Sequence, residues 1–171
     1  AVDTDSIIEA LLNGYGQRYG SWVNPPHANS SLKPWSYDPE KAKSLLTEAG
    51  YANGFTTIMD TPIGRYYKDE EVAKAIASYL AEVGIQVEVR SHDWPTYVRD
   101  FLIPKKTDPL FLLSLNSRAD GLEDVRNLTF EFPFNPTKWY NSEFEKLVRE
   151  AGVTFNQTKR QSLLEQAQSI A

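Results

Sequence analysis

The clearest hydrophobic pattern lies in the middle of the chain. Four apolar residues recur there at the spacing of one helical face: Val72, Ile76, Leu80 and Val83. Gly84 ends this pattern, and residues 85–90 then alternate between apolar and polar. The change from the helical period to the strand period predicts a helix that runs directly into a half-buried strand.

The segment before this helix predicts a second helix and a second strand. Asp38 can accept hydrogen bonds as the N-cap, Pro39 suits the first helical position, and Gly50 suits the left-handed residue at the end. Between them, one apolar face is formed by Ala42, Leu45, Leu46 and Ala49. Residues 55–61 then read as a strand, so strand, helix and strand follow one another as a parallel, right-handed βαβ unit.

Later segments extend this unit. Asp93 can cap a helix over 94–102, and the continuous apolar run 109–115 predicts a third strand that is buried on both faces. A short helix over 120–130 and two closing helices over 142–151 and 158–171 follow. At the other end, Asp3 or Thr4 can cap an N-terminal helix that Gly14 can stop; its apolar stripe is Ile7, Ile8, Leu11 and Leu12. The sequence therefore predicts an α/β fold with a βαβαβ central sheet flanked by helices and with strands near 55–60, 85–90 and 110–115.

Residues 13–37 show neither period and are rich in Pro, Asn and Ser. Five aromatic residues are spread along this segment: Tyr15, Tyr19, Trp22, Trp35 and Tyr37. We expect them to hold the long loop against a core. The alternative is that they form the surface of a stand-alone interaction module.

Composition excludes several classes of function. Apolar residues make up 41% and charged residues 24% of the 171 residues, as in globular proteins. The net charge of −5, with no basic patch, argues against a nucleic-acid partner. The chain has no Cys, so neither a disulfide nor a thiolate metal site can form. No apolar run approaches the roughly 20 residues of a membrane-spanning helix.

Signatures of catalysis are missing. The sequence contains no nucleophile elbow, no glycine-rich dinucleotide motif and no phosphate-binding loop, and neither His27 nor His92 has metal-ligand spacing to a partner. We therefore expect no catalytic residues, no metal and no cofactor. A small α/β hydrolase or transferase that uses Asp and Tyr groups remains an alternative, although no acid/base pair can be assembled from the sequence.

One loop is a candidate ligand site. Residues 115–121, LNSRADG, follow the third predicted strand, and loops at the carboxyl ends of parallel strands bind ligands in open α/β sheets. The candidate ligand-binding residues are Asn116, Ser117, Arg118, Asp120 and, just after the second strand, Trp94. The simpler interpretation is that Asp120 caps the next helix and that Trp94 belongs to the core.

Four ordered blocks of this sequence resemble the family 5 extracellular solute-binding proteins, the oligopeptide- and dipeptide-type receptors of bacterial ABC importers. The blocks are AVDTDSIIEALLNGYG, YDPEKAKSLLTEAGYANGF, VAKAIASYLAEVGIQVEVRSHDWPTYVRDF and YNSEFEKLVREAGVTFNQTKRQSLLEQAQSIA. The resemblance implies a periplasmic-binding-protein-like C-terminal lobe. Both ends of the chain lie in helical patterns, so we expect residues 1–171 to be one domain, most of the second lobe of a two-lobed receptor, whose N-terminal lobe is missing.

The resemblance also implies a function without catalysis. Such a receptor captures a small solute between its lobes and delivers it to an ABC permease in the membrane. We expect a periplasmic or extracellular location, with lipid anchoring through the missing N-terminus as one form of it. Trp94 would line the cavity, and Asp120 would pair with a peptide α-ammonium. The loop 115–121 departs from the family pattern because it lacks the Trp and the Asp-Pro of the family motif. The solute could therefore be a peptide, an oligosaccharide or a chelate.

Overall fold

The computed structural model describes residues 1–116 and 118–171. The chain divides into two compact units. The first unit contains residues 1–18, 36–101 and 106–114, and the second contains residues 19–35, 102–105 and 115–171. Each unit is described by itself below.

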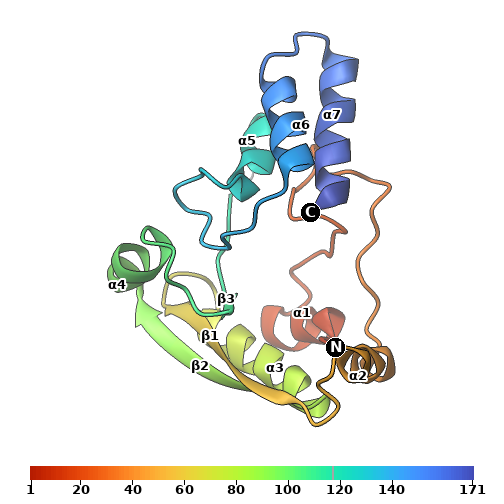
Figure 1. The fold of residues 1–171 in the computed structure, drawn as a ribbon. Coiled ribbons are helices and arrows are strands. Elements are labelled where there is room, and N and C mark those ends of the chain that lie inside the picture. Colours follow the sequence, from red (N-terminus) through yellow and green to blue (C-terminus); the bar gives the residue numbers. More distant parts are fainter. Residues whose placement is uncertain (117) are drawn as a thin grey trace. The chain divides into compact units, whose positions relative to one another are not determined.

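A three-stranded parallel sheet forms the centre of the first unit (Figure 1). Its strand order is β2-β1-β3, with β1 (Phe55–Ile63) paired to β2 (Ile85–Asp93) in a register that sets Phe55 opposite Ile85. Helix α3 (Asp69–Glu82) connects these two strands and packs against both. The predicted βαβ unit is therefore confirmed, including the change of period at Gly84.

The start of the sheet depends on two glycines. Gly54 and Gly84 precede β1 and β2 and have φ angles of +71° and +96°, a region that favours glycine. The backbone N–H of Phe55 donates to the carbonyl of Gly84 at 3.2 Å. A Cβ atom on Gly54 would collide with that same carbonyl, so the close approach of the two strands requires glycine.

The two N-terminal helices begin and end as predicted, but the apolar face of one of them is only partly covered. In α1 (Thr4–Leu12) the Asp3 carboxylate accepts from the backbone of the first turn. In α2 (Pro39–Glu48) the Asp38 carboxylate accepts from Lys41 N–H at 2.8 Å. No residue of α2 is buried, and Leu45 on its apolar face is 53% exposed.

The third strand differs from its prediction. β3 contains only Leu110–Phe111, which pair with Met59 and Asp60 of β1. Both residues are half-buried, so the expectation of a strand buried on both faces over 110–115 is wrong. β3 is an edge strand that pairs with β1 over two residues only, so the apolar run does not form the long central strand that burial on both faces requires.

A short helical segment joins β2 to β3. The Asp93 carboxylate caps α4 (Trp94–Thr96), as predicted, by accepting from Thr96 N–H at 3.1 Å. A π-helical segment, η1 (Tyr97–Leu102), continues it. Tyr97 is fully buried, and its hydroxyl donates to the carbonyl of Leu112 at 3.1 Å. Burial raises the pKa of this phenol, so the hydroxyl stays a donor.

The second unit is built on the pair of helices α6 (Ser142–Gly152) and α7 (Gln157–Ile170), which run antiparallel in Figure 1. The short helices α5 (Gly121–Val125) and η2 (Arg126–Leu128) complete it. Its core consists of Val23, Val125, Phe144, Leu147, Val148, Ala151, Leu163, Leu164 and Ala167. Phe144 is fully buried, with its ring edge-on to Trp139 at 5.0 Å.

The long loop is anchored by only some of its aromatic residues. Trp22 packs against the core of the second unit and donates to the carbonyl of Asp124 at 3.3 Å. Tyr37 lies edge-on to Tyr79 in the first unit. Tyr15 is 86% exposed, so the expectation that the aromatic residues hold the loop down is not met there.

Candidate solute-binding site

The backbone of the loop between β1 and α3 is bound by a single buried carboxylate. Asp69 is 4% exposed and accepts from the backbone N–H groups of Arg65 and Tyr66, both at 2.9 Å, and of Gly64 at 3.3 Å. Burial disfavours the charged form of Asp69, but these donors, together with that of Glu70, outweigh it and lower its pKa. The loop therefore has a fixed course at the carboxyl end of β1.

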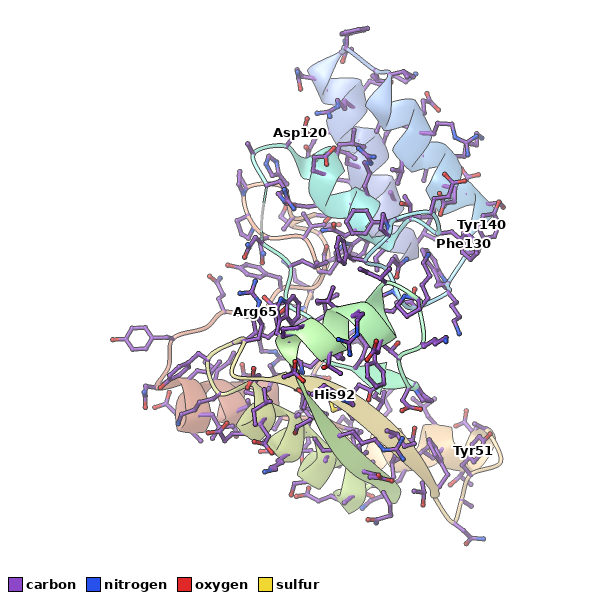
Figure 2. All side chains as sticks on the ribbon, turned by 90° about the vertical axis from the view of Figure 1, so that its left-hand side faces the viewer. Tyr51, Arg65, His92, Asp120, Phe130 and Tyr140 are labelled. Atoms are coloured by element: carbon purple, nitrogen blue, oxygen red, sulfur yellow. The ribbon has the colours of Figure 1, made fainter. Side chains whose placement is uncertain are left out.

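This loop places Arg65 on an aromatic platform. The Arg65 guanidinium lies 4.8 Å from the centroid of the Trp94 ring and 5.7 Å from that of Tyr66. The two rings meet edge-on at 6.0 Å, and the Tyr66 hydroxyl donates to the carbonyl of Ser114 at 3.3 Å. Figure 2 shows Arg65 beside this end of the sheet. Trp94 itself is half-buried.

The Arg65 guanidinium has no carboxylate partner among the described residues. A planar guanidinium that is stacked on an aromatic ring keeps its five donors available at its edge. These donors match a carboxylate or phosphate group in a paired geometry. The carboxyl end of the sheet in the first unit can therefore bind an anionic group of a ligand.

Asp120, in the second unit, caps helix α5, which was the simpler of the two roles predicted for it from the sequence. Its Oδ1 accepts from Leu122 N–H at the start of α5 at 2.9 Å, and its Oδ2 accepts from the Arg160 guanidinium at 2.8 Å. The hydrogen bond from Arg160 is the main cause of the lowered pKa of Asp120. The carboxylate is therefore charged and half-exposed, and Arg160 fixes its orientation.

The rest of the predicted loop is exposed. Asn116 and Arg118 both lie in solvent, and Ser117 falls outside the described residues. The backbone N–H of Arg118 donates to Oδ1 of the buried Asp124 at 2.9 Å. The backbone is thus tied down, whereas the Arg118 side chain is at the surface.

The predicted site residues belong to different units. Trp94 lies in the first unit, whereas Asn116, Arg118 and Asp120 lie in the second. None of these three residues is part of a strand or helix. The grouping of these residues around one ligand stays a prediction. Within the first unit, Trp94 is joined by Arg65 and Tyr66, which the sequence analysis missed.

The two histidines occupy structural positions. His92 Nε2 lies 2.8 Å from Oδ1 of the fully buried Asp60, and Oδ2 of Asp60 accepts from Asp108 N–H at 2.7 Å. The carbonyl of His27 accepts from Gln168 at 3.0 Å. Within residues 1–116 and 118–171, no three His, Asp or Glu side chains gather in a way that could hold a metal ion. In the same part of the chain, no helix combines the length and the apolar character needed to cross a membrane.

Comparison with known proteins decides the family. The family described as bacterial extracellular solute-binding proteins, family 5, middle part, matches residues 1–109. The chain belongs to this family. The resemblance found in the four sequence blocks is therefore confirmed.

Relatives and solved structures agree with this assignment. The chain is 30% identical over 181 residues to the dipeptide-binding protein of Escherichia coli K12, covering 99% of this chain and 33% of that protein. It is 32% identical to heme-binding protein A of Haemophilus influenzae, covering 99% and 32%. The periplasmic binding protein DppA of Helicobacter pylori, solved with the peptide STSA, superimposes with a TM-score of 0.86 at 25% identity, covering 99% and 34%.

These comparisons settle two expectations. The family 5 chain has the periplasmic-binding-protein fold that the sequence predicted, an α/β structure with a parallel sheet flanked by helices. The family is one of solute-binding receptors and not of enzymes, so the alternative of a small α/β hydrolase or transferase is set aside. The chain spans about one third of the length of the relatives that it matches.

Arg65 could have been predicted from the sequence, because loops at the carboxyl ends of parallel strands bind ligands in open α/β sheets. Residues 64–68, GRYYK, stand between a predicted strand and a predicted helix, at the carboxyl end of a parallel strand. The candidate residues named from the sequence follow the second and third strands only. The stacking of Arg65 on Trp94 joins the loop before α3 to the start of α4, about 30 residues further along the chain, and the sequence alone does not show it.

Proposed function

We propose that this chain is part of the substrate-binding component of an ABC importer, which captures a small solute between two lobes. The observation that carries the proposal is the stacked Arg65 guanidinium at the carboxyl end of the parallel sheet, which has no carboxylate partner among the described residues. Membership of family 5 supports the same role.

The chemistry of the proposed site favours a solute with charged ends. Arg65 would pair with a carboxylate of the solute, and Asp120, if it faces the same ligand, would pair with an ammonium group. Trp94 and Tyr66 would offer flat apolar surface beside Arg65. A short peptide meets all three demands. The names of two relatives, for dipeptides and for heme, are compatible with it because both ligands carry carboxylates. An oligosaccharide or a metal chelate is the alternative solute.

The partners and location are part of the same proposal. The solute would be closed in by an N-terminal lobe and passed to a permease in the membrane. The site would act in the periplasm or outside the cell, with a lipid anchor as one way of staying at the membrane. Residues 1–171 would form one domain, most of the C-terminal lobe, and would supply only part of the contacts to the solute.

A thermal-shift screen of the full-length receptor tests this proposal. Ligands that bind the native state raise its melting temperature, so a set of dipeptides and tripeptides should raise it, while oligosaccharides and metal chelates should not. A screen in which only oligosaccharides or chelates raise the melting temperature would replace the peptide by that class. A screen with no shift for any class would contradict the receptor function.

The role of Asp120 needs a variant that keeps the helix cap. Asp120→Asn retains an oxygen that can accept from Leu122 N–H, but it removes the negative charge. We expect peptide binding to weaken by about 1–3 kcal/mol if this charge meets the solute's ammonium group. Glu123→Gln, a charge removal at an exposed neighbouring position, is the control and should leave binding unchanged. Unchanged affinity in Asp120→Asn would leave Asp120 with its capping role alone.

A further inference from the structure

The second unit contains a cavity that the proposed receptor site does not use. It has a volume of about 630 Å³ and lies between α5, η2, the segment 129–133, Tyr140 and α6. Volumes of about 300–1,000 Å³ are typical of sites for small molecules. All of its lining residues belong to the second unit, so the cavity is defined without reference to the first.

Apolar side chains and an aromatic pair form much of its wall. Leu122, Val148 and Gly152 contribute from α5 and α6. Phe130 and Tyr140 meet edge-on at 5.9 Å and 89°, and they are 45% and 63% exposed (Figure 2). Such rings would gain from being covered by an apolar group of a ligand.

Two of the four charged residues in the lining already have partners. Arg126 pairs with Glu123 at 2.8 Å. Glu145 accepts from Phe130 N–H at 2.7 Å, which fixes the segment that carries this ring. The Phe130 carbonyl is also bound by Lys105 at 2.5 Å, with the ammonium 5.1 Å from the ring centroid.

The other two charged residues, Arg149 and Glu131, have neither an ion pair nor a side-chain hydrogen bond among the described residues. The lining therefore offers one guanidinium and one carboxylate that are free to bind, beside exposed aromatic rings. The two Arg and two Glu of the lining cancel in charge, so a ligand with a large net charge of either sign gains little from the cavity as a whole.

We propose that this cavity binds a small zwitterion with an apolar side chain, a free amino acid or a very short peptide, independently of the site around Arg65. Arg149 pairs with its carboxylate and Glu131 with its ammonium, while the side chain lies against Phe130 and Tyr140. A neutral sugar would use the hydroxyl-binding capacity of these groups but leave both charges unpaired. The zwitterion satisfies all of the free groups at once.

Titration of the full-length receptor by NMR or calorimetry tests the proposal, with L-phenylalanine as the probe. N-acetyl-L-phenylalanine lacks the ammonium, L-phenylalaninamide lacks the carboxylate, and mannitol tests for a neutral polyol. We expect saturable binding of L-phenylalanine and binding at least about tenfold weaker for each blocked form, because each loses a hydrogen-bonded charge pair. Absence of saturable binding, or equal binding of the blocked forms or of mannitol, would overturn the proposal.

Variants locate the bound probe. Arg149→Gln should weaken binding by about tenfold or more. Lys146→Gln, which removes an exposed charge from the same helix outside the cavity lining, should leave it unchanged. Arg65→Gln serves to separate the two sites: binding that is lost in Arg65→Gln but kept in Arg149→Gln belongs to the receptor site and refutes the cavity proposal. The reverse result supports the cavity and leaves the receptor function untouched.

Discussion

Replacement of Asp69 by Ala should loosen the loop that carries Arg65. The change removes the acceptor of three backbone hydrogen bonds of 2.9 Å, from Arg65, Tyr66 and Glu70, and of a longer one from the exposed Gly64. Each of the three short bonds contributes about 1 kcal/mol net, while the Gly64 N–H can turn to water at little cost. We therefore expect a loss of about 3 kcal/mol in the free energy of unfolding and a fall of roughly 6–12 °C in the melting temperature.

The stabilisation that Asp69 provides should depend on pH. Since the pKa of Asp69 is lower in the folded protein than in the unfolded chain, its stabilisation is present above the unfolded value of about 4 and is lost as the pH falls through the lowered folded value. The difference between the wild type and Asp69→Ala should therefore be full at pH 7 and shrink in that acid range.

Urea unfolding at several pH values measures both effects. Asp69→Asn keeps one oxygen acceptor and should lose about half as much stability. Glu71→Ala, in the same first turn of α3 but exposed, should change stability by less than about 0.5 kcal/mol. The reasoning is refuted if Asp69→Ala unfolds at the same urea concentration as Glu71→Ala, or if its deficit is unchanged across the acid range.

Two further predictions concern packing, and thermal unfolding checks both. Gly54→Ala should destabilise the protein by more than about 3 kcal/mol, because the new Cβ atom would meet the carbonyl of Gly84. Gly50 is also at positive φ but has open space around it, so Gly50→Ala should lower the free energy of unfolding by only about 1 kcal/mol. Equal losses of stability in the two variants would contradict the collision at Gly54. Phe144→Ala should lose about 3–5 kcal/mol, because the ring is fully buried against Trp139; a loss below about 1 kcal/mol would mean that this core is not packed as described.

Local signals in the sequence were sufficient for most of the fold. Asp38, Asp93 and Asp120 cap the helices that were expected after them, since a cap depends only on a residue and the three that follow. The change of period at Gly84 marked the junction between α3 and β2 for the same reason.

Features that depend on the order of the strands could not be read in this way. The apolar run 109–115 suits a buried strand, but β3 lies at the edge of the sheet and pairs over two residues only. The apolar face of α2 is equally clear in the sequence, yet no residue of this helix is fully buried. Periodicity shows which face of an element is apolar but not whether a partner covers that face.

The candidate site was predicted in part. Trp94 was correctly placed just after β2, because the strand pattern fixes where the strand ends. Its contact with Arg65 joins the start of α4 to the loop before α3, and the hydrogen bond from Arg160 to Asp120 joins residues 40 positions apart. Such contacts follow from tertiary packing and leave no periodic trace in the sequence.

The central claim is that Arg65 binds the anionic end of the captured solute. Titration calorimetry of the full-length receptor tests it, comparing wild type and Arg65→Gln with a dipeptide and with the same dipeptide amidated at its carboxyl end. We predict that Arg65→Gln weakens binding of the free acid by about 1.5–3 kcal/mol, at least tenfold, and hardly changes binding of the amide. Equal affinity of wild type and Arg65→Gln for the free acid would contradict the account.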